Sequence, residues 1–96
     1  MSSLMHVVEL DGDWVELAAA DTYDSFGFQI DGHGTAAIAV ATTIPAADAT
    51  DYIILRGRDD GDTQSFSMDL PAGYAVYGRQ LGQKPAVVRG YRVPSA

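Results

Sequence analysis

The sequence predicts an all-β fold, a single-domain antiparallel β-sandwich or barrel-like jelly roll of about eight short strands over residues 1–96. Apolar and polar residues alternate with period two in short runs, and Gly, Asp and Pro separate these runs. No long stretch has the i, i+3, i+4, i+7 apolar stripe of an amphipathic helix. A chain of 96 residues also has the size of one domain.

Eight runs have the pattern of a strand. The expected strands are residues 5–10, 14–19, 26–31, 35–43, 52–57, 64–70, 74–79 and 86–93. In the third run Phe26, Phe28 and Ile30 share one face, because successive side chains of a strand point to opposite sides. Phe66, Met68 and Leu70 do the same in the sixth run. Both sets are expected to face the core.

Two of the runs have an unusual apolar pattern. Residues 35–43 have Ile38 and Val40 on one face and alanines 37, 39 and 41 on the other. The alanine face leaves room for another layer, which is either a loop of the same chain or a second subunit, and we expect the loop. Residues 52–55 (YIIL) are apolar on both faces, which predicts a central strand.

Turn residues separate the runs. Asp-Gly sequences tolerate the positive φ of a tight type I′ hairpin. Residues 11–13 (DGD) are therefore expected to join the first two strands as a hairpin, residues 31–34 (DGHG) the third and fourth, and residues 59–62 (DDGD) the fifth and sixth.

Composition narrows the function classes. The formal net charge of −7 disfavours nucleic acid as a partner, because phosphate would be repelled. The absence of cysteine removes disulfides, thiolate catalysis and Cys-based zinc sites. The N-terminus has no legible signal peptide, and the most apolar segment, residues 36–47, is too short to span a bilayer, so we expect synthesis in a host cytoplasm and no membrane partner.

No motif predicts an enzyme, a metal site or a cofactor. Asp59, Asp60 and Asp62, or Asp11 and Asp13, lack the ligand spacing of a calcium loop. His6 and His33 lack zinc-ligand spacing, and Ser25 and Ser65 lie in no nucleophile elbow. We therefore expect a protein without catalytic residues and without a bound cofactor.

Charge is distributed unevenly along the chain. The first 55 residues contain nine acids and no Lys or Arg, whereas the last twenty contain four bases and no acid. Such polarity suggests charged faces that meet complementary surfaces on a neighbour. The candidate interface residues are the six bases: Arg56, Arg58, Arg79, Lys84, Arg89 and Arg92. The N-terminal residues 2–5 are a further candidate contact with a partner.

Several short motifs resemble small β-sandwich virion proteins of tailed bacteriophages. The matching segments are residues 14–18 (WVELA), 28–30 (FQI), Pro45, 52–57 (YIILRG), 76–79 (VYGR) and 88–93 (VRGYRV). Where the family has Gln-Asn, this chain has Gln29-Ile30. The resemblance implies a capsid decoration (cement) protein, or a related head, neck or tail component, that forms a homotrimer and binds the major capsid protein lattice on the virion surface.

One other class fits the same sequence. A carbohydrate-binding or adhesin-like β-sandwich module needs exposed aromatic rings, and the chain contains Trp14 and five tyrosines. Trp14 and Tyr77 are the aromatic residues whose replacement would test sugar binding. Packing inside the domain is the expected role of Trp14, because it opens an alternating strand.

Overall fold

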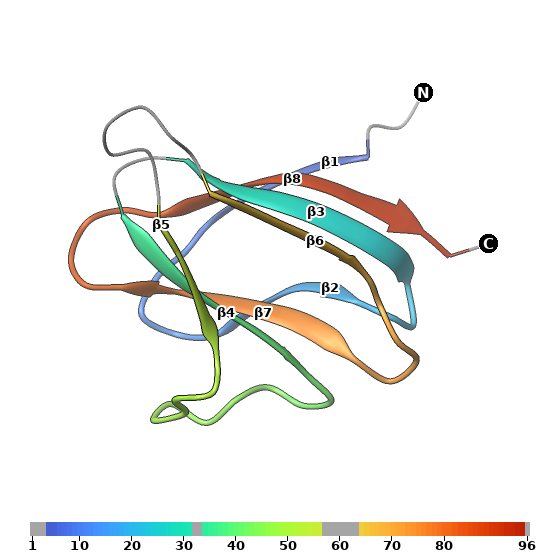
Figure 1. The fold of residues 1–96 in the computed structure, drawn as a ribbon, viewed down its shortest axis with the longest axis horizontal. Helices are drawn as coiled ribbons and strands as arrows, with labels where there is room; N and C mark the ends of the chain where they lie inside the picture. Colours follow the sequence, from blue (N-terminus) through green and yellow to red (C-terminus); the bar gives the residue numbers. More distant parts are fainter. Residues whose placement is uncertain (1–3, 32–33, 57–63, 96) are drawn as a thin grey trace.

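The structure is a computed structural model that describes residues 4–31, 34–56 and 64–95, and these ranges contain eight β-strands and no helix (Figure 1). The strands are β1 (Met5–Glu9), β2 (Val15–Ala19), β3 (Tyr23–Asp31), β4 (Thr35–Ala41), β5 (Ile53–Arg56), β6 (Ser65–Asp69), β7 (Ala75–Leu81) and β8 (Val87–Pro94). Each lies within a few residues of its expected position. The predicted all-β sandwich is confirmed.

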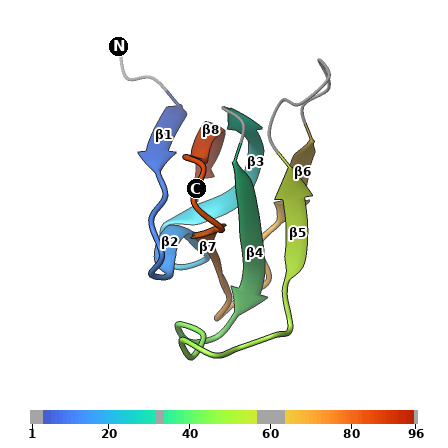
Figure 2. The ribbon, with the colours of Figure 1, turned by 90° about the vertical axis from the view of Figure 1, so that its left-hand side faces the viewer.

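The strands form two four-stranded antiparallel sheets that pack face to face. Sheet A has the order β1-β8-β3-β6, and sheet B has the order β2-β7-β4-β5. The chain therefore pairs its first strand with its last, its second with its seventh, its third with its sixth and its fourth with its fifth. This nested pairing is the jelly-roll arrangement. Figure 2 shows β5 and β6 at one side of the sandwich and β1 and β2 at the other.

The predicted hairpins are wrong. β1 and β2 belong to different sheets, as do β3 and β4, and β5 and β6, so the turn after β1 crosses from one sheet to the other. The two other predicted turns fall mainly on residues 32–33 and 57–63, outside the described residues. Asp-Gly sequences indicate where a chain reverses but do not decide whether the next strand pairs with the last one. Among the described strands, only β4 and β5 are both consecutive in the chain and paired with each other, and a long loop joins them.

The main core lies between the two sheets. Phe26, Phe28 and Ile30 of β3 are buried there, as the alternation predicts. Phe66, Met68 and Leu70 are half-buried against the same cluster, because β6 is an edge strand. Leu17 and Val76 fill the core from sheet B. Alternating residues of both sheets thus supply one apolar layer.

A second apolar cluster covers the outer face of sheet B. It contains Trp14, Ala37, Ala39, Ala75 and Tyr77, all buried, with Tyr52 packed against them. The alanine face of β4 therefore packs within the subunit, as expected. The loop of residues 42–52 closes this face, and the backbone carbonyl of Ala46 accepts a hydrogen bond from the indole Nε1 of Trp14 at 3.1 Å.

The predicted central position of residues 52–55 is wrong. β5 is the edge strand of sheet B, and Ile53 and Ile54 are 44% and 51% exposed. Tyr52 packs against the outer cluster of sheet B, and Leu55 is buried in the main core. Apolar residues therefore alternate to both faces of β5 although the strand has only one neighbour, β4.

Candidate functional site

The fold brings acidic and basic segments of the chain together. The jelly roll places β1 beside β8 and β3 beside β8, so the acidic first half and the basic last strand lie side by side. Arg89 Nε lies 2.7 Å from a carboxylate oxygen of Asp31 on the neighbouring strand. Opposite charges that are distant in sequence are therefore close in the fold at this pair.

Arg79 of β7 lies inside the outer cluster of sheet B. Its guanidinium carbon is 4.8 Å from the centroid of the Trp14 ring and 5.8 Å from that of Tyr52. Its Nη1 donates a hydrogen bond of 2.6 Å to the carbonyl of Ala47, whereas its Nε is buried without a described partner. Arg79 thus fastens the 42–52 loop to sheet B, and its contact with a neighbouring molecule stays a prediction.

Arg92 bridges the two sheets at the other side of the sandwich. Its guanidinium carbon lies 4.3 Å from the centroid of Tyr23, and its Nη1 donates to the carbonyl of Leu17 at 3.3 Å. His6 of β1 is close to this cation and to Phe28, with ring centroids 6.3 Å apart. Burial and the charge of Arg92 lower the pKa of His6 from its ordinary value of 6.5.

Of the three remaining candidate interface bases, the structure describes Arg56 and Lys84 but not Arg58. Arg56 and Lys84 are exposed. The Arg56 backbone N–H donates to the side-chain oxygen of Gln64 at 2.7 Å, which leaves the guanidinium outside this contact. Arg58 lies outside the described residues. For Arg56 and Lys84, a contact with a neighbouring molecule stays a prediction.

The metal candidates form no cluster among the described residues. In residues 4–31, 34–56 and 64–95, no three side chains of His, Cys, Asp or Glu gather closely enough to hold a metal ion. Asp11 instead accepts the backbone N–H of Asp13 at 2.9 Å, which stabilises the turn after β1. Asp59, Asp60, Asp62 and His33 lie outside the described residues.

The aromatic residues proposed for sugar binding are not available at the surface. Trp14 and Tyr77 are 8% and 7% exposed, and both belong to the outer cluster of sheet B. Burial and the charge of Glu16 raise the pKa of Tyr77. The exposed aromatic side chains include Tyr91 on β8 and Tyr74 at the start of β7. Any stacking surface for a ligand must therefore be sought at these tyrosines.

Two of the hollowed surfaces formed by the described residues are relevant to function. The first is a groove of about 390 Å³ across the outer face of sheet A, where Met5, Val7 and Tyr91 are exposed. We call it the outer groove. The second, of about 350 Å³, lies between the edge strands of the two sheets and is lined by residues that include Val40, Ile53 and Phe66. We call it the open edge.

Sequence reasoning missed both surfaces. Alternation correctly separates Met5 and Val7 from the inward residues of β1, so their outward position could have been inferred once β1 was assigned. That β5 and β6 lie at an open side follows only from the strand order. The order depends on pairings between residues far apart in the sequence, which no local pattern encodes.

Comparison with known proteins does not assign this chain to a family. No protein-family model matches this sequence, and neither a curated protein nor a solved structure matches it. Among the described residues, no helical segment has the length and apolar character of a transmembrane span. The function must therefore be argued from the fold and from its uncovered surfaces.

Proposed function

We propose that this chain is a non-enzymatic structural protein of a bacteriophage virion, of the capsid decoration type, which forms a homotrimer and binds the major capsid protein lattice. The observation on which the proposal depends is the open edge of the sandwich, where apolar side chains remain uncovered. The jelly-roll fold supports it in general terms, since viral capsid proteins use this architecture among others.

The open edge combines two features of a protein contact. Ile53 and Ile54 are large apolar residues in an edge strand, and the hollow between β5 and β6 exposes part of the main core through Val40 and Phe66. Natural proteins usually blunt or cover such edges, because an unpaired strand invites association. A second copy of the chain that covers this edge would bury the two isoleucines.

A closed ring of three copies would cover every open edge with the next copy. A 96-residue chain has only a modest core, so burial between copies would add to its stability. The exposed cations Arg56 and Lys84, together with the N-terminal residues around Leu4, remain candidates for contacts with the capsid lattice. Arg89 is exposed as well, with its Nε paired to Asp31.

Light scattering tests the trimer. The expected molar mass is about three times that of the 10.2 kDa monomer. Ile53→Asp places a charge in the open edge and is expected to reduce the mass to that of a monomer. Ile44→Asp is the matched control, because Ile44 is 59% exposed in the 42–52 loop, and it should leave the trimer intact. A monomeric wild-type protein across a salt series would contradict the trimer.

Cosedimentation tests the lattice partner. Purified expanded capsids that lack the protein should carry the wild type into the pellet at low salt. Arg56→Glu with Lys84→Glu should weaken the binding, and retention should fall as salt rises, because exposed charges are screened. A protein that stays in the supernatant at low salt contradicts the decoration assignment. The observed oligomer would then have to serve another structural role.

A further inference from the structure

The outer groove lies on a regular grid of side chains across sheet A. The strand register aligns Met5, Tyr91, Gly27 and Ser67 in one row, and Val7, Arg89, Gln29 and Ser65 in the next. The sheet therefore presents apolar residues on the β1 side and small polar residues on the β6 side. The groove runs between them with a volume of about 390 Å³.

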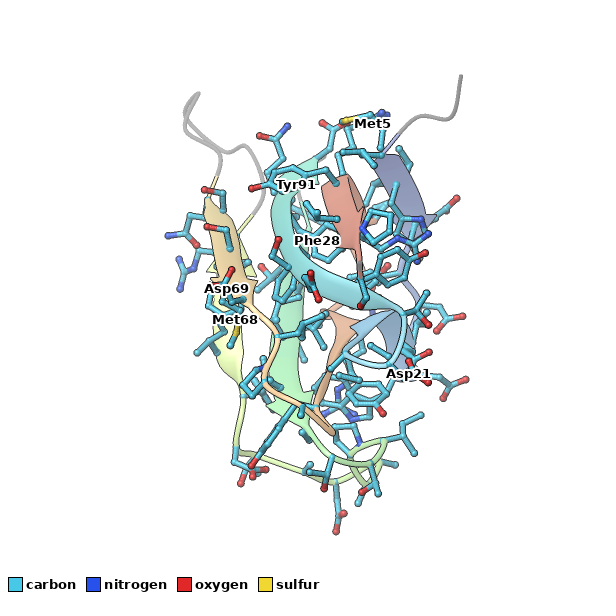
Figure 3. The ribbon with its side chains drawn as sticks, turned by 90° about the vertical axis from the view of Figure 1, so that its right-hand side faces the viewer. Met5, Asp21, Phe28, Met68, Asp69 and Tyr91 are labelled. Atoms are coloured by element: carbon cyan, nitrogen blue, oxygen red, sulfur yellow. The ribbon has the colours of Figure 1, made fainter. Side chains whose placement is uncertain are left out.

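Tyr91 lies flat across this grid. A Cβ atom at Gly27 would be 2.6 Å from Cε1, Cζ and the hydroxyl oxygen of Tyr91, so a larger residue at this position would displace the ring. Figure 3 shows Tyr91, which belongs to β8, reaching across β3. The ring remains 42% exposed. One face of the aromatic ring rests on the backbone, and the side chain stays accessible from the groove.

Polar side chains border the apolar part. The side chains of Gln29, Ser65 and Ser67 make no hydrogen bond to any residue that the structure describes, and all three are exposed. Arg89 is held in place by Asp31 through its Nε. The groove thus offers an aromatic surface, two apolar side chains and several hydrogen-bonding groups that are not used by the fold.

We propose that the outer groove binds carbohydrate, with a neutral pyranose ring against Tyr91 and its hydroxyl groups hydrogen-bonded to Gln29, Ser65 and Ser67. A pyranose has an apolar C–H face and a rim of hydroxyls, which matches this combination of an aromatic ring and polar neighbours. Met5 and Val7 would contact the apolar part of a neighbouring sugar unit.

Two other ligand classes fit the groove less well. A purely apolar peptide would cover Gln29 and the two serines without bonding them, which costs free energy for each buried polar group. An anionic ligand would find the groove's arginine, Arg89, already paired with Asp31. The inference does not depend on the proposed virion role, because it concerns another face of the molecule than the open edge.

A glycan array followed by an NMR titration tests the site. The array screens neutral oligosaccharides and uronic-acid glycans, and the best neutral ligand is then titrated into ¹⁵N-labelled protein. The backbone amides of Gly27, Gln29 and Ser67 are expected to shift saturably. Tyr91→Ala should weaken binding about tenfold, the effect of one aromatic contact. Tyr74→Ala is the matched control, at 40% exposure outside the groove, and should bind like the wild type.

A second variant keeps the test valid if Tyr91→Ala fails to fold. Gln29→Ala with Ser67→Ala removes two exposed polar groups, should unfold like the wild type, and should weaken binding several-fold. Three results would each overturn the proposal: no glycan on the array is bound, only acidic glycans are bound, or the shifted amides lie outside the outer groove. Unchanged affinity in a folded Tyr91→Ala protein would do the same.

Discussion

The two sheets expose very different outer faces. Sheet B has small residues there, Ala37, Ala39 and Ala75, and the space above them is filled by Trp14 and by the 42–52 loop. Sheet A has Gly27 on its outer face, and the ring of its own Tyr91 lies over this glycine. The comparison teaches that a small sandwich can gain a second apolar cluster on one outer face and leave the other face open.

The role of Trp14 gives the largest expected effect. Trp14→Ala removes a buried ring that packs against Tyr52 at a centroid distance of 5.9 Å and bonds the loop at Ala46. The free energy of unfolding should fall by about 3–5 kcal/mol, as for other buried aromatic residues. Because Trp14 is the single tryptophan, denaturant unfolding is followed by circular dichroism.

Tyr91→Ala is the matched change on sheet A. Its ring is much more exposed than that of Trp14, so the free energy of unfolding should fall by about 1 kcal/mol or less. Equal losses for the two variants would show that the outer face of sheet A is as important for stability as that of sheet B. The proposed difference in stability between the two outer faces would then be wrong.

The central glycines of the two sheets give the next effect. A Cβ atom at Gly90 of β8 would collide with the carbonyl of Gly27 and lie 2.8 Å from Cα of Phe28, so the backbone itself must move. At Gly78 of β7 it would meet side-chain tips of Leu17 and Ile38, at 3.1 and 3.3 Å.

We expect Gly90→Ala to destabilise the protein by about 2–3 kcal/mol and Gly78→Ala by about 1 kcal/mol or less, since flexible side chains adjust more easily than backbone. Thermal unfolding of the two variants measures the difference. A Gly78→Ala protein that is the less stable of the two would mean that sheet B, rather than sheet A, has the tighter packing at its centre.

Replacing an arginine of each sheet should give a smaller difference in unfolding free energy than the glycine variants. Arg79→Ala removes the cation above Trp14 and the bond to Ala47, and should cost about 1–2 kcal/mol of unfolding free energy. Arg89→Ala breaks an ion pair whose side chains are 49% and 48% exposed, and should cost at most about 1 kcal/mol. Chemical denaturation of both variants measures this. A larger loss for Arg89→Ala would reverse the assignment of the stabilising arginine to sheet B.

The smallest effect concerns pH. The pKa of His6 is lowered in the folded protein, so the unfolded chain binds the proton more tightly. The contribution is fully present above the unfolded pKa of about 6.5 and is lost as the pH falls below it. The melting temperature should therefore drop between pH 7.5 and pH 5.5, and the drop should be smaller in His6→Gln. An unchanged pH dependence in that variant would remove His6 as its cause.

Local pattern predicted the strands far better than it predicted the surfaces. The inward set of β3 and the two faces of β4 follow from period-two alternation, and the structure has them as expected. The hairpins and the central position of β5 were wrong, because both depend on which strands pair. The outer groove forms only because Gly27 of β3 and Tyr91 of β8, which are 64 positions apart in the sequence, are paired neighbours in sheet A.

The sequence by itself determined the fold class, the approximate positions of the eight described strands and the core-facing sides of β3 and β6, since these depend on the alternation of neighbouring side chains. Only the tertiary structure decided that the acidic and basic segments lie together, that β5 is an edge and that Tyr91 rests on Gly27. These features arise from long-range pairing, in which the first strand of the chain meets the last.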